Sequence, residues 1–274
     1  MAVFEHGEHD IHYTLEGDPK KPVLVILNGI MMSTLSWEPF KEAFLKDVRL
    51  LRLDLLDQGR SSKMSGNYDQ TVQVDMLEAL FTALDLQEMT LAGISYGGNV
   101  ALQYAAKHPE RLDGLVVFNA VEKTTDWLKA IGRGWNEVAK TRNAEAYYHV
   151  TIPMIYSPHF YNDNPQWMAA RKEKVLPVFA DPAFLDAMSR LTTSAESHDV
   201  SETLRNIEVP TLVVASEHDY LTPPFEQTRI VEKMPNARLV TFNGCGHASM
   251  YEKPDLFVST IIGFIQENHR TYDI

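Results

Sequence analysis

The sequence predicts an α/β fold, in which a mostly parallel sheet is covered by helices on both faces. Six short runs, almost wholly apolar and rich in Val, Ile and Leu, suit strands buried on both faces: "PVLVILNG" (22–29), "VRLLRLDL" (48–55), "MTLAGIS" (89–95), "LDGLVVFNA" (112–120), "PTLVVASEHD" (210–219) and "ARLVTFNG" (237–244). Segments with helical spacing separate these runs. Regular alternation of strands and helices is typical of this class.

The elements outside these runs follow from local signals. The stretch 2–15 predicts two strands around a glycine, forming an antiparallel hairpin at the sheet edge. Residues 70–84 place apolar side chains on one face at helical spacing. A second helix is expected over 97–108, ending there because the residue before Pro109 avoids helical angles. A last helix is expected over 254–267, with a proline in its first turn.

The alternation breaks between residues 121 and 204. The pattern of this stretch is typical of helices with interspersed polar residues, and the strand pattern resumes only after it. We interpret 121–204 as a helical cap inserted over the carboxyl edge of the sheet. Residues 1–120 and 205–274 then form the α/β core.

Composition excludes several classes of protein. The formal net charge of −12 disfavours binding of nucleic acid or of an anionic membrane. Hydrophobic residues make up 45% of the 274-residue chain, enough for a large core. The single cysteine, Cys245, cannot form an intramolecular disulfide, and the first ten residues lack a signal-peptide pattern. We therefore expect a cytoplasmic protein that binds neither nucleic acid nor membranes.

A lone serine stands among glycines in "GISYGG" (93–98), between a predicted strand and a predicted helix. A sharp turn at Ser95 would lift its hydroxyl clear of the sheet. Gly93 and Gly97, two residues away on either side, avoid the side-chain collisions that such a turn creates, and Gly98 lets the helix approach the strand closely. The pattern indicates a nucleophile at Ser95, with the amino end of the helix favouring an oxyanion.

A serine nucleophile needs a base, which we expect in the loop after the last strand. His247 follows Gly244 and Gly246 in "TFNGCGHASMYEKP". These glycines allow the loop to carry the imidazole back over the sheet. His218 and His198 remain alternatives.

The base in turn needs an acid that orients it, expected at the end of an earlier strand. Asp219 lies just beyond the run "TLVVAS" and falls between Ser95 and His247, giving the order Ser, Asp, His. Glu217, two residues earlier, and Glu122, after "VVFNA", are alternative acids.

These residues resemble the α/β-hydrolase superfamily over nearly the whole chain. "GISYGG" resembles its nucleophile elbow, "LDLLDQGRSS" its D-x-x-G-x-G-x-S turn, "EHDYLTPP" its acid loop and "GCGHASMYEKPDLF" its histidine loop. The resemblance implies an eight-stranded, mostly parallel sheet, a helical cap, and a triad of Ser95, Asp219 and His247.

The chain departs from the family pattern at two places. Family members usually carry His-Gly after the third strand, where this chain has Asn28-Gly29-Ile30. The resemblance implies an oxyanion hole made by the backbone N–H groups of Ile30 and Tyr96. In the other motif Asp57 replaces the first glycine, and we expect it to form the turn in a left-handed conformation.

Other residues are weaker candidates. Met31 and Trp37, beside the proposed oxyanion loop, are expected to touch substrate. Six cap residues could line an acyl pocket or pack the cap on itself: Trp127, Trp135, Met154, Tyr156, Phe160 and Trp167. His6, His9 and His12 recur every three residues, which alternates faces of a strand, so we expect no metal site.

The leading hypothesis is a serine hydrolase, free of cofactors and metals, that acts on a small-molecule acyl substrate. The scissile bond would be a small or medium carboxylic ester, thioester or lactone. Acyl transfer and carbon–carbon bond hydrolysis use the same triad and stay open. So does a non-catalytic binding protein on a hydrolase fold.

Overall fold

The structure, a computed structural model, describes residues 2–269. Within this range one sheet contains eight strands in the order β1-β2-β4-β3-β5-β6-β7-β8. The strands are β1 (Ala2–His6), β2 (His9–Glu16), β3 (Val23–Leu27), β4 (Arg49–Leu53), β5 (Met89–Ile94), β6 (Leu112–Phe118), β7 (Thr211–Ser216) and β8 (Ala237–Phe242). β1 with β2 and β2 with β4 pair antiparallel, and the other five pairs are parallel. The predicted fold class is confirmed.

The predicted edge hairpin is also confirmed. β1 and β2 pair from Ala2 opposite Tyr13 to His6 opposite His9. Gly7, in the turn between them, has φ +62°, a conformation that glycine adopts without steric cost.

The strands differ in burial. Every residue of β5 and of β7 is buried, as continuous apolar runs predict. The run at 237–244 also forms a strand, but the prediction that it is buried on both faces is wrong. β8 is the last strand of the sheet, and Leu239 and Val240 are 38% and 37% exposed.

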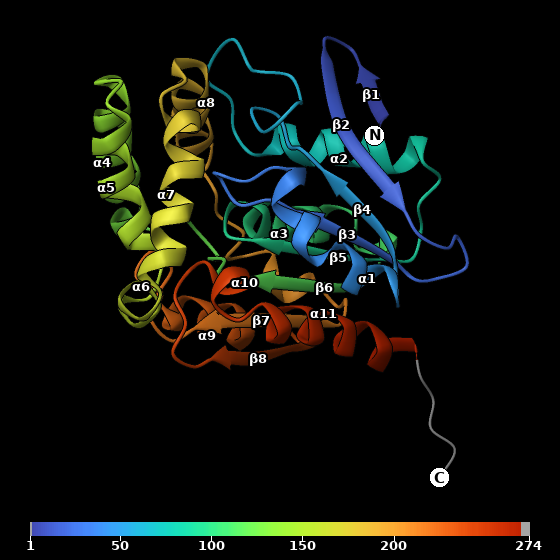
Figure 1. The fold of residues 1–274 in the computed structure, drawn as a ribbon. Coiled ribbons are helices and arrows are strands. Elements are labelled where there is room, and N and C mark those ends of the chain that lie inside the picture. The colour runs from blue at the N-terminus through green and yellow to red at the C-terminus, as the bar shows by residue number, and fades with distance from the viewer. Residues whose placement is uncertain (1, 270–274) are drawn as a thin grey trace.

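Helices cover both faces of the sheet (Figure 1). α1 (Lys41–Leu45), which follows the short 3-10 helix η1 (Thr34–Phe40), contacts α11 (Pro254–His269) in front of the sheet. α2 (Thr71–Ala83) and α3 (Tyr96–Lys107) pack together behind it. The remaining core helices are α9 (Pro224–Lys233), which packs on β7 and β8, the short α10 (Ser249–Glu252), η2 (Pro109–Arg111) and η3 (Leu204–Asn206).

Five helices lie between β6 and β7, inside the stretch for which a cap is predicted. They are α4 (Asp126–Lys140), α5 (Ala144–Ile155), α6 (Pro158–Asp163), α7 (Pro165–Phe179) and α8 (Pro182–Ser194). Local signals set their starts: Thr125, Asn143, Ser157 and Asp181 accept hydrogen bonds from first-turn amides, and α6, α7 and α8 begin with proline. Figure 1 shows the longer cap helices beyond the carboxyl ends of the parallel strands.

The chain enters and leaves this cap side by side. The amide of Thr124 donates to the carbonyl of His198 at 2.9 Å, and that of Val200 donates to Glu122 at 2.8 Å. Side-chain contacts also tie the cap to the core further out. Arg190 of α8 pairs with Asp57, and Ser157, at the start of α6, pairs with Glu252 of α10. The cap is therefore anchored at both of its connections and at several points beyond them.

Candidate active site

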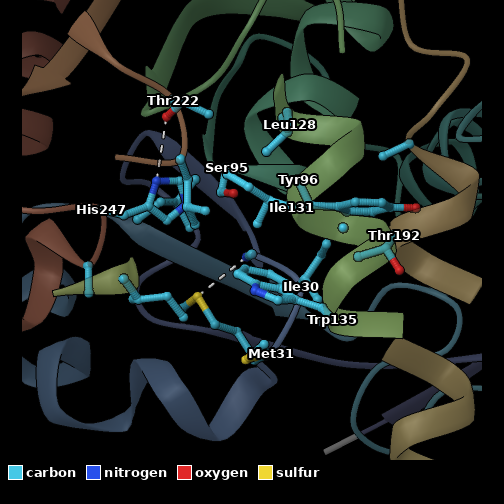
Figure 2. Close-up of a pocket in the computed structure, with 18 of the residues that line it drawn as sticks. Ile30, Met31, Ser95, Tyr96, Leu128, Ile131, Trp135, Thr192, Thr222 and His247 are labelled. Atoms are coloured by element: carbon cyan, nitrogen blue, oxygen red, sulfur yellow. Dashed lines mark hydrogen bonds between the residues drawn. The ribbon is translucent and has the colours of Figure 1, made fainter. Parts of the chain in front are cut away.

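The residues predicted to be catalytic lie in loops at the carboxyl edge of the sheet. Ser95 follows β5 directly, Asp219 lies three residues after β7, and His247 lies five residues after β8. Carboxyl ends of parallel strands meet at one edge, so side chains far apart in sequence converge there. Ser95 and His247 both line one cavity between the sheet edge and the cap (Figure 2).

Ser95 occupies a strained turn between β5 and α3. Its backbone has φ 54° and ψ −118°, in the region that side-chain-bearing residues rarely adopt. The turn is held by two hydrogen bonds: the Ser95 amide donates to Phe118 at 2.8 Å, and the Asn99 amide donates to Ser95 at 2.9 Å. From Met89 to Leu102 every residue is buried except Ser95. Ser95 is thus the one residue of this segment that is only partly buried, and it lines the cavity.

The glycines around Ser95 have the steric role that the sequence predicts. A Cβ on Gly93 would lie 2.3 Å from the carbonyl oxygen of Gly97. A Cβ on Gly97 would lie 2.6 Å from the carbonyl oxygen of Leu27, and one on Gly98 would lie 2.8 Å from the Cβ of Ala120. The first two contacts are with backbone atoms, which cannot move aside without disturbing the sheet.

The structure brings the predicted base and acid into contact. His247 Nδ1 lies 2.7 Å from Asp219 Oδ2, and both side chains are almost fully buried. A carboxylate accepts hydrogen bonds, so this contact fixes the proton on Nδ1 and leaves Nε2 as the acceptor nitrogen. Among the described residues no direct hydrogen bond joins Ser95 to His247. Such contacts are often long in a free enzyme and shorten when substrate binds.

Two residues that the sequence reading missed support this pair. The amides of Leu221 and Thr222 donate to Asp219 Oδ1 at 2.8 and 2.9 Å, and the Thr222 hydroxyl lies 2.8 Å from Oδ2. Asn119, at the end of β6, donates from its side chain to the His247 carbonyl at 2.7 Å. Thr222 therefore orients the Asp219 carboxylate, and Asn119 holds the loop that carries His247.

A sequence signal for Asn119 was present in "VVFNA". The residue has φ 51°, and asparagine is enriched in this left-handed conformation at turns. The same motif suggested Glu122 as an alternative acid. Glu122 instead forms an ion pair with Lys233 at 2.5 Å.

The alternative bases have other partners. The ring of His198 is buried, with Nδ1 2.9 Å from the Gln103 side chain and Nε2 2.9 Å from the Val121 carbonyl. Burial lowers the pKa of His198 to about 4. The rings of His218 and His159 lie 5.2 Å apart. Neither His198 nor His218 is among the residues that line the cavity.

The predicted oxyanion loop and the turn at Ser95 both face the cavity. Ile30 and Tyr96 line it together with Ser95. Within residues 2–269 the backbone amides of Ile30 and Tyr96 have no hydrogen-bond acceptor in the protein. Two free N–H groups at the cavity wall suit the stabilisation of a developing negative charge.

Asn28 occupies the position where the family usually carries histidine, and its side chain organises the loop. Its Nδ2 donates to the Leu53 carbonyl at 2.9 Å and to the Gln58 side chain at 3.0 Å. Its Oδ1 accepts a 2.6 Å hydrogen bond from the Trp37 indole. Gln58 continues this network by donating to the Gly29 carbonyl at 2.9 Å. The loop before Ile30 is thus held by asparagine in place of histidine.

The placement of Trp37 contradicts the prediction that it touches substrate. Trp37 is 0% exposed, is not among the cavity-lining residues, and stacks on Phe257 with ring centroids 6.0 Å apart. Its indole is drawn inward because Asn28 accepts its N–H. Met31 does line the cavity (Figure 2), and its contact with substrate stays a prediction.

Asp57, which replaces a family glycine, has φ 68°, the left-handed conformation expected of a turn-former there. Its buried carboxylate also accepts hydrogen bonds from Arg190 Nη2 at 2.6 Å and Nε at 3.0 Å. The sequence did not predict this second role, because Arg190 lies 133 residues away in the cap.

The rest of the cavity wall comes mainly from the cap. Figure 2 shows Leu128, Ile131 and Trp135 of α4 opposite the loops that carry Ser95 and His247. Of the six cap residues named from the sequence, Trp135 and Tyr156 line the cavity, whereas Trp127 is 57% exposed. Phe160 and Trp167 pack around Tyr156. The lining is largely apolar, which suits an uncharged acyl group.

No group of three His, Cys, Asp or Glu side chains suited to a metal ion occurs in the described part of the chain. In the same residues, no helix combines the length and apolar character needed to cross a lipid bilayer.

A family model described as alpha/beta hydrolase fold matches residues 22–254. The chain belongs to the α/β-hydrolase family. This α/β hydrolase is 52% identical to MGS-M2, an α/β-hydrolase enzyme from a Medee basin deep-sea metagenome library, whose crystal structure matches with a TM-score of 0.96 over 100% of both chains.

Two further relatives of this α/β hydrolase are more distant. RutD of Caulobacter sp. (strain K31), provisionally named a carbamate hydrolase, is 26% identical over 94% of each chain. The enol-lactonase of Burkholderia xenovorans LB400 shares the fold, with a TM-score of 0.85 and 21% identity over 96% of this chain and 99% of its own.

Proposed function

We propose that this α/β hydrolase cleaves small or medium carboxylic esters, thioesters or lactones through an acyl-enzyme on Ser95. One observation carries the proposal. A histidine held at 2.7 Å by a buried aspartate lines the same cavity as a serine whose strained backbone exposes it. No cofactor is needed for this chemistry.

In the first step His247 Nε2 accepts the Ser95 hydroxyl proton as the serine oxygen attacks the acyl carbonyl. The imidazolium that forms is stabilised by Asp219, which already accepts the Nδ1 proton. His247 then returns the proton to the leaving atom. This atom is the oxygen of an alcohol or opened lactone, or the sulfur of a thiol. The acyl group remains bonded to Ser95.

The free amides of Ile30 and Tyr96 stabilise the negative oxygen of the tetrahedral intermediate. Loss of one such donor typically lowers the rate by about 10² to 10³. Water, activated by His247, then attacks the acyl-enzyme and releases the acid.

The relatives support a hydrolase that acts at an acyl carbon. One is named for carbamate cleavage and another for enol-lactone cleavage. Both reactions begin with attack on a carbonyl carbon, which the Ser95 arrangement can perform. The small-molecule substrate, the triad and a cytoplasmic location are parts of this proposal.

The test combines a covalent probe with substrate hydrolysis. A fluorophosphonate should label the parent protein and leave Ser95→Ala unlabelled. The parent should hydrolyse esters or lactones from a series of graded acyl length. Faster formation of an ester than of free acid, when hydroxy acceptors are supplied, would instead indicate acyl transfer. Absence of both labelling and turnover would contradict the proposal and favour a binding protein.

A further inference from the structure

The cavity that holds Ser95 carries positive charge in an otherwise acidic protein. Besides the catalytic histidine, the charged side chains on its wall are Lys129 of α4, Arg171 of α7, and Glu196. Glu196 already lies 3.5 Å from Arg133. Within residues 2–269 neither Lys129 nor Arg171 forms an ion pair. In a chain of formal net charge −12, two cations without ion-pair partners among the described residues thus line the cavity that holds the candidate nucleophile.

Arg171 is the more deeply embedded of these cations. Its Nε is buried and has no hydrogen-bond partner among the described residues. Its guanidinium lies over the Tyr251 ring, 5.0 Å from the centroid, and close enough to Tyr156 to oppose the rise that burial imposes on the pKa of that phenol. Arg171 therefore contacts aromatic rings and has no ion-pair partner among the described residues. A guanidinium removed from water is stabilised best by a carboxylate or phosphate, which it can bind with two parallel hydrogen bonds.

The position of Arg171 makes it reachable from the cavity and from outside. Arg171, Met250 and Tyr251 line both the cavity and an outer groove formed by η1, α1, α7, α10 and α11. An anionic group bound at this wall keeps access to the water of the groove. The cost of removing its charge from water is correspondingly smaller.

We propose that Arg171 binds a free carboxylate of the substrate, so that the acyl group or leaving group of the cleaved ester or lactone carries a negative charge. This inference rests on the proposed function, because it assigns a substrate class to the same cavity. Lys129 adds positive potential at the cavity wall, but its ammonium group lacks the planar geometry by which a guanidinium forms two parallel hydrogen bonds. The apolar lining then holds the carbon chain between the scissile bond and the carboxylate.

The first experiment measures binding without turnover. In the Ser95→Ala background, isothermal titration compares monomethyl succinate, glutarate, adipate and suberate with the corresponding dimethyl esters. At least one monoester should bind more tightly than its diester. Arg171→Gln should weaken that monoester by about 10-fold to 100-fold and leave the diester within about twofold. Lys129→Gln should have a smaller effect in the same direction.

Lys174→Gln is the matched control. Lys174 lies one turn further along α7 and lines the outer groove but not the cavity. Its loss changes net charge equally and should leave both ligands unaffected. If Arg171→Gln folds poorly, two other tests take its place. Arg171→Lys, and added salt with the unsubstituted Arg171, should each weaken binding of the monoester and leave binding of the diester unchanged.

The same pairs of esters, given to the parent enzyme, extend the test to catalysis. The ratio of kcat/KM for monoester over diester should fall in Arg171→Gln and stay unchanged in Lys174→Gln. Equal binding of monoester and diester at every length would overturn the inference. So would an equal loss for both ligands in Arg171→Gln, which would indicate that Arg171 only supports Tyr251. Neither outcome depends on turnover, whereas failure of the proposed function would appear as absent hydrolysis and absent labelling of Ser95.

Discussion

The nucleophile turn and the cap meet at the same cavity but are built in opposite ways. Backbone hydrogen bonds hold the turn at Ser95. The glycines around it occupy positions where neighbouring atoms leave no room for a side chain. The cap meets the core partly through contacts between side chains distant in sequence, such as the ion pair of Arg190 with Asp57. On the proposed function, local backbone geometry would set the chemistry at Ser95, and side chains of the insertion would select the substrate.

The largest expected effect comes from removing the proposed nucleophile in the turn between β5 and α3. Ser95→Ala should lower kcat by about 10⁴-fold or more, because no acyl-enzyme can form. The thermal unfolding midpoint should stay near that of the parent, since the substitution removes only one exposed hydroxyl. Steady-state kinetics and thermal unfolding measure the two effects. Substantial residual hydrolysis would show that another group is the nucleophile.

Breaking the ionic contact between cap and core should have the next largest effect. Arg190→Met leaves the Asp57 carboxylate, whose side chain is 0% exposed, without its cationic partner. We expect a loss of about 3 kcal/mol in the free energy of unfolding, measured by urea denaturation.

The matched control for Arg190 lies on the surface. Arg142 pairs with Asp186 at 2.7 Å, but both side chains are largely exposed. Arg142→Met should cost about 1 kcal/mol or less. The double variant Asp57→Asn with Arg190→Met should recover part of the loss, because no unpaired charge remains and asparagine tolerates the left-handed turn. Equal losses in the two single variants would contradict a special role for the buried pair.

His198 links the core to the base of the cap and should make stability depend on pH. Its pKa of about 4 in the folded protein lies below the ordinary value of 6.5 because the ring is buried. The folded state therefore binds fewer protons than the unfolded chain between these values. Its stabilisation is present above about pH 6.5 and is lost, by up to about 3 kcal/mol, as the pH falls towards 4.

Urea denaturation at about pH 7 and about pH 4.5 measures this effect of His198. His198→Gln should reduce the pH dependence, and His149→Gln, at an exposed cap position, serves as the control. An unchanged pH profile in His198→Gln would contradict the assignment.

The smallest predicted effect concerns the oxyanion loop. Asn28→Ala removes the hydrogen bonds to Leu53, Gln58 and Trp37, so the Ile30 amide should lose its fixed position. We expect kcat to fall by about 10-fold to 100-fold with KM nearly unchanged, since the loop acts mainly on the developing oxyanion. Asn136→Ala, on the cap, should leave kcat within about twofold. A change confined to KM would assign Asn28 to substrate binding instead.

The sequence by itself determined the strands and turns that depend on residues close together in the chain. The apolar runs predicted the parallel strands, and the glycines at 93, 97 and 98 predicted a turn in which, as the structure shows, added Cβ atoms would collide with nearby atoms. The positions of Asp219 and His247 just after strands placed them at one edge of the sheet, where the structure joins them.

Tertiary structure decided what depends on contacts between distant segments. Trp37 lies beside the predicted loop in sequence, yet its indole turns away from the cavity to meet Asn28. The support that Asn119 gives to His247 and the pairing of Asp57 with Arg190 join residues more than 100 positions apart. Strand and turn preferences act over a few residues, whereas burial, charge pairing and the direction of a side chain are fixed only when the whole chain has packed.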